Sequence, residues 1–271
     1  MMHKLLISTL IIFSFVLMVY ADEQEDRLND WYKPDSWDGK DSKNKPGFNL
    51  KGLKVDGCET GEIEHQPKQP SRREFKKDDK PAFNVFVNVC KSASEAHKQL
   101  LAFLGNVSND KKMKRLSELE LNIGHIGYIY SEDNKTHWIA FVRNNVFILI
   151  MITDVDAELD LEKVAENIDK QINKQDDVTE LPMPEIKAFK AQKDSISLEE
   201  KVVLDIEVKS NADGDVDLHF EIKGEGQGFV EKGEDGKYYF KGTGKGKVKI
   251  IVTSTNSLCN QTESDIEINI G

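Results

Sequence analysis

The sequence predicts an α+β domain, an antiparallel sheet with two helices, followed by an all-β sandwich. Between residues 76 and 175, segments with the two-residue apolar period of a strand are interrupted by two segments of helical period. From residue 184 to residue 271, every periodic segment has the strand period, and turn residues separate the segments. Strands mixed with helices indicate an α+β domain, whereas a run of short strands indicates a sandwich.

The first 21 residues have the layout of a secretory signal peptide. Lys4 gives a basic start, an apolar run follows, and Ala21 is a small residue at the expected cleavage point. The run from Leu5 to Met18 is shorter than the ~20 residues that a membrane-spanning helix needs. We therefore expect cleavage after Ala21, a secreted or periplasmic location, and no integral membrane segment in the mature chain.

The acidity of the chain restricts its partners. It contains 48 Asp and Glu residues against 37 Lys and Arg residues, and its formal net charge is −11. Binding to nucleic acid depends on concentrated positive charge that neutralises phosphates. We expect no nucleic-acid partner, and we interpret the basic run 111–115 as a solvated loop or helix end.

Residues 22–75 predict a flexible acidic and proline-rich tether. The segment has many charges and few aliphatic side chains, so it offers little apolar surface to offset the entropy of ordering the chain. Trp31, Tyr32 and Trp37 are exceptions. These aromatic side chains are expected to dock on the folded domain; the alternative is a short recognition motif.

The α+β domain, residues 76–175, begins with a strand and a helix. Apolar residues alternate from Phe83 to Val89, and Ser92 and Glu95 then form the pattern of a capping box. Apolar residues recur at helical spacing from Ala96 onward, and Gly105 suits the end of that helix.

A hairpin and a second helix complete this domain. A short strand is expected at 124–130, and strands at 137–143 and 146–153 flank the turn Asn144–Asn145. Residues 147–152 are apolar on both faces, which indicates a central, covered strand. Apolar residues from Leu161 to Ile172 follow the spacing of an amphipathic helix.

Residues 176–183 predict a linker, and residues 184–271 predict the sandwich. Short strands are expected at 202–209, 216–223, 238–241, 247–254 and 265–270. Their spacing of roughly 8–12 residues is typical of sandwiches. Phe240 is expected in the core.

Several segments of the C-terminal third carry a resemblance. Asp213-Gly214-Asp215 before a strand, Gly236 to Phe240, and Gly246 to Val252 together resemble bacterial immunoglobulin-like and cadherin-like modules of cell-envelope proteins. This resemblance implies an immunoglobulin-like sandwich that acts as a spacer or adhesion module. In topology alone, the α+β half is similar to small secreted domains of the Mog1/PsbP-like type, which assigns no site residue.

Three cysteines occur in the chain, at positions 58, 90 and 259. In an oxidising compartment two of them would pair, and Cys58 and Cys90 lie in the same half of the chain, so we predict a disulfide between them. Alternatively, Cys90 is a thiol nucleophile with His97 as its base, which requires a lowered thiol pKa and an imidazole within hydrogen-bond reach.

Two groups of residues are weighed as sites. His125 and His137 could serve an enzyme or a metal, although their spacing matches no established pattern. Asp213, Asp215 and Asp217 are calcium candidates, and the alternative is an ordinary Asp-Gly turn. Acceptor sequences for N-glycosylation begin at Asn106, Asn134 and Asn260 and matter only in a eukaryotic secretory protein.

We expect an exported, non-catalytic binding or structural protein of the cell envelope or extracellular space, with a protein or envelope ligand as its partner and no cofactor. Two alternatives stay open. One is an exported enzyme that uses Cys90 or His125/His137, and the other is a carrier of a lipophilic ligand with a cavity beside the second helix.

Overall fold

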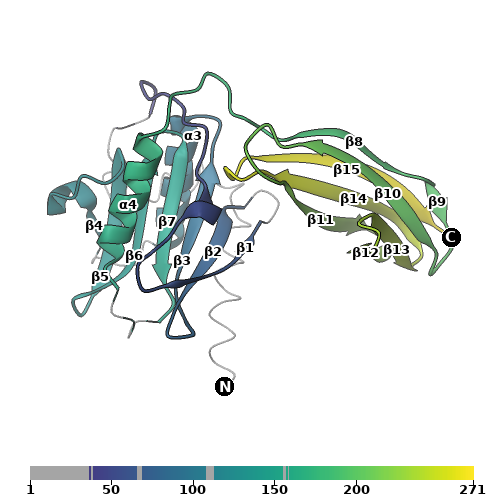
Figure 1. Ribbon diagram of the computed structural model, residues 1–271, viewed down its shortest axis with the longest axis horizontal. Helices are drawn as coiled ribbons and strands as arrows, with labels where there is room; N and C mark the ends of the chain where they lie inside the picture. Colours follow the sequence, from purple (N-terminus) through teal and green to yellow (C-terminus); the bar gives the residue numbers. More distant parts are fainter. Residues whose placement is uncertain (1–36, 38, 66–68, 108–112, 155–156, 158) are drawn as a thin grey trace. The chain divides into compact units, whose positions relative to one another are not determined.

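The computed structural model describes residues 37, 39–65, 69–107, 113–154, 157 and 159–271 (Figure 1). The expected signal peptide, Trp31 and Tyr32 lie outside these residues. The chain divides into an N-terminal unit, Met1–Glu64 with Gln69–Leu181, and a C-terminal unit, Pro182–Gly271 with His65–Lys68. Among the described residues, no helix combines the length and apolar character needed to cross a membrane.

The N-terminal unit is built on one antiparallel sheet of seven strands in the order β1-β2-β3-β7-β6-β5-β4. The apolar strand at 147–152 is central, as predicted, and β3 and β6 pair with its two edges. The strands are β1 (Glu59–Glu64), β2 (Ser71–Lys77), β3 (Lys80–Val89), β4 (Met113–Arg115), β5 (Ile126–Glu132), β6 (Lys135–Arg143) and β7 (Val146–Ile152).

One helix covers each face of this sheet (Figure 1). Helix α3 (Ala93–Val107) packs with the face that carries Trp138, Ala140 and Val142. Helix α4 (Leu161–Asn173) packs against β6 from the other side, where Arg143 reaches it. Since successive strand residues point to opposite faces, this arrangement uses both apolar faces of the central strands.

The start of α3 follows the predicted capping box in part. The Glu95 N–H donates to the Ser92 hydroxyl at 3.2 Å, as expected. The Glu95 carboxylate, however, accepts from the Lys91 N–H at 2.9 Å. Both contacts satisfy backbone donors that a helix start would otherwise leave open.

The expected tether over 22–75 is wrong for its described second half. Residues 59–64 and 71–77 are strands of the sheet, and Phe48, Leu50 and Leu53 are buried. The short helices η2 (Leu50–Gly52) and η3 (Leu116–Leu119) are also ordered elements of this unit.

The buried Arg73 explains how such a polar segment becomes ordered. Its guanidinium donates to the carbonyl oxygens of Leu50 at 2.9 Å and Lys51 at 2.7 Å. These charge-assisted bonds satisfy backbone acceptors of a segment with little regular structure, so a few apolar residues suffice to hold it on the sheet.

The C-terminal unit contains two four-stranded sheets that share one core. Their orders are β12-β13-β10-β8 and β11-β14-β15-β9. Phe240 is fully buried between them, as predicted, with Leu204 from its own sheet and Ile250 from the other. The strands are β8 (Glu185–Ala191), β9 (Ser195–Ile196), β10 (Lys201–Lys209), β11 (Asp217–Gly224), β12 (Gln227–Lys232), β13 (Tyr238–Gly244), β14 (Gly246–Thr255) and β15 (Gln261–Ile270).

The expected linker over 176–183 is bonded at both of its ends. Within the N-terminal unit, the Val178 N–H donates to the Asn44 carbonyl at 2.9 Å. Within the C-terminal unit, the Asn256 side chain donates to the Pro182 carbonyl at 2.6 Å. The connecting segment between these two bonds is therefore residues 179–181, shorter than predicted.

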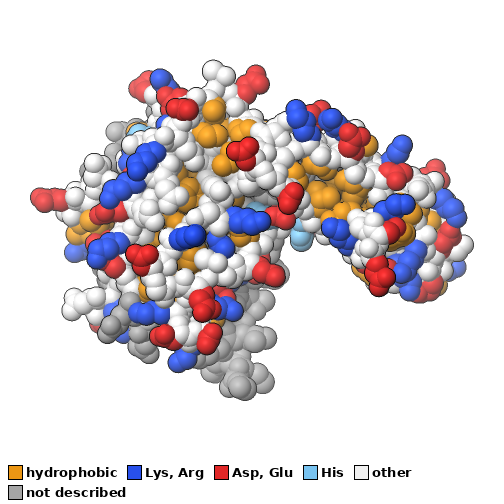
Figure 2. All heavy atoms as spheres, viewed as in Figure 1, with side chains coloured by type: hydrophobic (Ala, Val, Ile, Leu, Met, Phe, Trp, Pro, Cys, Tyr) orange, Lys and Arg blue, Asp and Glu red, His pale blue; other side chains and the backbone are white. Residues whose placement is uncertain are grey.

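Charged side chains of both signs are interspersed over the face seen in Figure 2. No extended basic surface is visible there.

Candidate functional site

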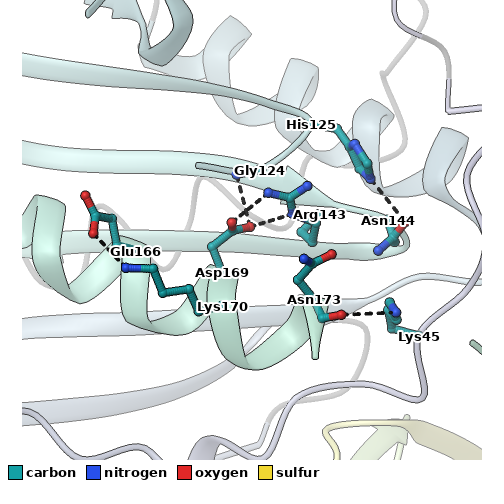
Figure 3. A network of polar contacts seen from close by, with 9 residues as sticks. All are labelled: Lys45, Gly124, His125, Arg143, Asn144, Glu166, Asp169, Lys170 and Asn173. Carbon is teal, nitrogen blue, oxygen red and sulfur yellow. Dashed lines mark hydrogen bonds and ion pairs between the residues drawn. The ribbon is translucent and has the colours of Figure 1, made fainter. Parts of the chain in front are cut away.

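Polar contacts gather where β6 turns into β7, at one end of the N-terminal unit (Figure 3). The turn residues are Asn144 and Asn145, as predicted, and Asn144 has a φ of 55°, which asparagine tolerates. We call this region the hairpin end. It brings together the turn, helix α4, the start of β5 and the segment around Lys45.

Arg143 and Asp169 form the central ion pair of the hairpin end. The Arg143 guanidinium donates two bonds of 2.6 Å, one to each carboxylate oxygen of Asp169. Asp169 also accepts the Gly124 N–H at 3.0 Å. Two parallel charge-assisted bonds fix both distance and angle, so the pair sets how α4 lies against the hairpin.

Lys45 ties another segment to the end of α4. Its ammonium donates to the carbonyl oxygens of Asn173 at 3.4 Å and Gln175 at 2.5 Å, and it lies 3.0 Å from Asp177. The last carbonyls of a helix lack partners within the helix, and a cation there also interacts favourably with the helix dipole. The lysine therefore closes the end of α4.

Asn145 joins the turn to two distant segments. Its side-chain oxygen accepts the Lys45 N–H, and its amide donates to the Cys90 carbonyl at 3.1 Å. Asn145 is fully buried, so these bonds are screened from water. They hold the hairpin end in one conformation.

The His125 imidazole and the Trp37 indole lie next to this polar network. His125 is exposed, and its Nε2 is 3.1 Å from the Asn144 side-chain oxygen. The Trp37 ring stacks on His125 with centroids 5.5 Å apart, and its edge meets the buried His97 at 5.3 Å. Three aromatic rings from distant parts of the sequence thus form one cluster.

The surroundings lower the pKa of His125 below the ordinary imidazole value. Partial withdrawal from water is the main cause, and the positive charge of Arg143 adds to it. The bond to Asn144 and the negative charge of Asp169 act in the opposite direction. The neutral ring is therefore favoured at neutral pH, with one nitrogen able to donate and the other able to accept.

Cys90 lacks the features of a nucleophile. Its side chain is 5% exposed, and burial together with the negative charge of Glu95 raises the pKa of its thiol. A nucleophilic cysteine needs a lowered pKa, because the thiolate is the reactive form. A helix N-terminus close to a thiol lowers its pKa, and at Cys90 desolvation outweighs this effect of α3.

The two candidate histidines of the enzyme hypothesis lie far apart. His125 is level with the hairpin turn, since its N–H donates to the Val142 carbonyl. His137 lies at the other end of β6, where it contacts Tyr130. Along the strand their separation is about 20 Å, which excludes a shared metal ion or a direct proton transfer.

The predicted disulfide between Cys58 and Cys90 is wrong in this structure. Both are free thiols, and the strand register explains why. Cys58 precedes Glu59, which is level with Lys76 and Pro81, whereas Cys90 follows the far end of β3. The distance along β3 is about 30 Å, and a disulfide requires Cα atoms within about 7 Å.

The calcium candidates do not form a cluster. Asp213 and Asp215 are exposed in the loop before β11, and Asp217 begins that strand. Within the described parts of the chain, no three His, Cys, Asp or Glu side chains converge as metal ligands would. Of the glycosylation candidates, Asn106 and Asn134 are exposed and Asn260 is buried.

Sequence patterns identified part of the hairpin end. The Asn144–Asn145 turn and the candidate His125 were expected, and Trp37 docks on the folded domain as predicted, against the rings of His97 and His125. Lys45 was missed because it lies in the segment expected to be a tether, and Asp169 because it is one acid among many on an amphipathic helix. No protein-family model and no curated protein sequence matches the chain.

Proposed function

We propose that this chain is an exported, non-catalytic binding protein of the cell envelope or extracellular space. The hairpin end of its N-terminal unit contacts a protein or envelope ligand, and its C-terminal unit is an immunoglobulin-like spacer or adhesion module. The single observation that carries the binding role is an exposed imidazole, stacked on a half-buried indole and held on a buried polar network.

The strand order of the C-terminal unit supports the immunoglobulin-like assignment. An immunoglobulin sandwich of the constant type has strands A-B-E-D in one sheet and C-F-G in the other. If β8 is strand A, β10 is B and β11 to β15 are C to G, the observed sheets have the same order. The short β9 then pairs in parallel with β15 as a continuation of the first strand.

Rigid support favours recognition at the hairpin end. Binding surfaces gain affinity when their side chains are ordered before the ligand arrives, because less entropy is lost on association. The buried Asn145 and the Arg143–Asp169 pair order the turn against which His125 lies. Trp37 adds a broad, rigid ring of the kind that is enriched in binding hot spots.

The chemistry of Cys90 and the burial of α4 favour a binding protein over the enzyme and the lipophilic-ligand carrier. The raised thiol pKa of Cys90 opposes a thiol enzyme. The apolar side chains of α4, including Val164, Ile168 and Ile172, are buried within the unit. They contribute to its core, so the helix face that a lipophilic ligand would need is already in use.

Capture by the immobilised mature chain, residues 22–271, tests this function. Envelope and culture-supernatant extracts from the source organism supply the ligands, and bound material is compared between the parent, Trp37→Ala, His125→Ala and a control, His137→Ala. We expect both hairpin-end variants to weaken a specific interaction by about tenfold or more, and the control to leave it unchanged. A ligand captured equally by all four proteins would contradict the assignment of the hairpin end.

A further inference from the structure

The edge strand β11 has a sequence that is complementary to itself. It lies at one end of the sheet β11-β14-β15-β9, and among the described strands only β14 pairs with it (Figure 1). Its second edge therefore presents backbone N–H and C=O groups of a strand that runs from Asp217 to Gly224. Such an edge is a template for another strand.

Consider two copies of β11 that pair antiparallel with Phe220 on the two-fold axis. In this register Asp217 of one copy faces Lys223 of the other, and His219 faces Glu221. Each relation occurs twice, because an interface with two-fold symmetry repeats every contact. Opposite charges directly across an antiparallel pair stabilise it, and an imidazole N–H can donate to a carboxylate.

The other side of the strand is apolar and also matches itself. Leu218 faces Ile222, and Phe220 faces its own copy. All three side chains are only partly buried in the single chain, and Phe220 and Ile222 lie at the margin of the sandwich core. Pairing would extend this core across the two-fold axis and remove more apolar surface from water.

The sheet places two lysines opposite each other next to this edge. Lys223 lies directly opposite Lys249 of β14. Like charges in this position are destabilising, and each lysine has one carboxylate beside it: Glu221 lies 3.0 Å from Lys223, and Asp265 lies 3.1 Å from Lys249. A carboxylate from the second copy would add a further negative charge beside the two lysines.

The remaining long edge strands lack this property. Strand β1 contains three glutamates and no basic residue, so two copies would repel each other. When two copies of β8 are paired antiparallel, no register with substantial overlap places an acidic residue opposite Lys187. On β12 the only acidic residue is Glu231, which is next to Lys232 in the sequence. Strands β4 and β9 are too short to pair usefully.

We propose that two copies of this chain associate through antiparallel pairing of β11, which joins two four-stranded sheets into one continuous sheet of eight strands. The partner is thus a second copy of the same protein. This association goes beyond ligand binding at the hairpin end and does not depend on it, since the two features lie in different units.

A charge-exchange experiment on the full mature chain tests the proposal. Asp217→Lys places two lysines opposite each other in a homodimer, and Lys223→Asp places two aspartates opposite each other. Each variant alone should weaken self-association by roughly 10- to 100-fold, as measured by sedimentation velocity over a range of concentrations. An equimolar mixture of the two should associate like the parent, because every facing pair is then of opposite sign.

Controls separate this mechanism from general effects of charge. Lys187→Glu reverses a charge on the edge strand β8 and should leave association unchanged. Circular dichroism and thermal melting establish that each variant is folded. Asp217 also lies 3.3 Å from His65, so Asp217→Lys removes that contact as well. The Lys223→Asp variant keeps it, and loss of the contact cannot explain association that returns in the mixture.

Hydrogen exchange gives a second measurement that needs no variant. The β11 amides directed away from β14 should exchange more slowly as the concentration of the parent rises. A parent that stays monomeric at its solubility limit, or a mixture that associates no better than its components, would overturn the proposal. Concentration-independent exchange along β11 would do the same.

Discussion

Asn145 pairs with Lys45 as a neighbouring strand residue would, although 100 positions separate them. The Lys45 N–H donates to the Asn145 side-chain oxygen at 2.6 Å, and the Asn145 amide donates back to the Lys45 carbonyl at 3.1 Å. A single side chain thereby satisfies both backbone groups of a residue outside any strand. It anchors the segment that carries Trp37.

Replacing Asn145 should therefore destabilise the N-terminal unit. Asn145→Ala leaves the backbone groups of Lys45 and the carbonyl of Cys90 buried without this partner. Each unsatisfied group costs about 1–3 kcal/mol, so we expect a loss of at least ~3 kcal/mol in the free energy of unfolding, measured by urea titration. Asn134→Gly, in the exposed turn between β5 and β6, is the control and should change stability little.

The Arg143–Asp169 pair should behave differently in single and double variants. Asp169→Ala leaves the largely buried guanidinium without its carboxylate and should cost about 3–5 kcal/mol. Replacing both residues, as in Arg143→Met with Asp169→Leu, should cost much less, because no uncompensated charge remains. Equal losses in the single and double variants would show that the two residues do not act as a pair.

The thiols should differ in reactivity. Cys58 is partly exposed, although burial raises its thiol pKa against the opposing effect of Lys77. Cys90 is buried and its pKa is raised further. Alkylation of the native protein followed by mass spectrometry should modify Cys58 first, and Cys90 only on unfolding. A peptide in which Cys58 and Cys90 are linked would contradict the register of β1 to β3.

The pKa of His125 in the folded protein should lie below the ordinary imidazole value, which is about 6.5 in the unfolded chain. Because its folded pKa is lowered, the unfolded chain binds the proton first, so stability is full above ~6.5 and falls as the pH drops through the folded pKa. NMR of the imidazole ring measures that midpoint directly. Trp37→Ala uncovers the ring face on which the indole stacks and should shift the midpoint upward. An unchanged midpoint would argue against desolvation by the indole.

The C-terminal unit should fold alone. A fragment that begins at Pro182 keeps the bond between Asn256 and the Pro182 carbonyl. Phe240 is fully buried between the two sheets, so Phe240→Ala should cost on the order of 3–5 kcal/mol and leave the fragment close to unfolding. Phe229→Ala, at an exposed aromatic on β12, is the matched control. Absence of a cooperative thermal transition in the parent fragment would contradict an independent fold.

The sequence was informative where one apolar face repeats locally. Strand β7, helix α4 and the Asn144–Asn145 turn were predicted because each has a complete pattern within a dozen residues. Strand β1 was missed because Ile63 is its only aliphatic residue; it is a strand because β2 offers it an edge. The position of Asp169 opposite Arg143 depends on how a helix packs on a hairpin, which no local pattern contains.

Where the chain passes from Leu181 into the C-terminal unit, the bonds at Val178 and Pro182 leave three residues, 179–181, between them. These residues span at most about 10 Å when fully extended. A tensile force on the C-terminus would therefore reach, with little slack, the bridge between Asn44 and Val178 and the ion pairs of the adjacent Asp177 with Lys43 and Lys45. Rupture of these contacts would release the segment back to α4 and lengthen the connection.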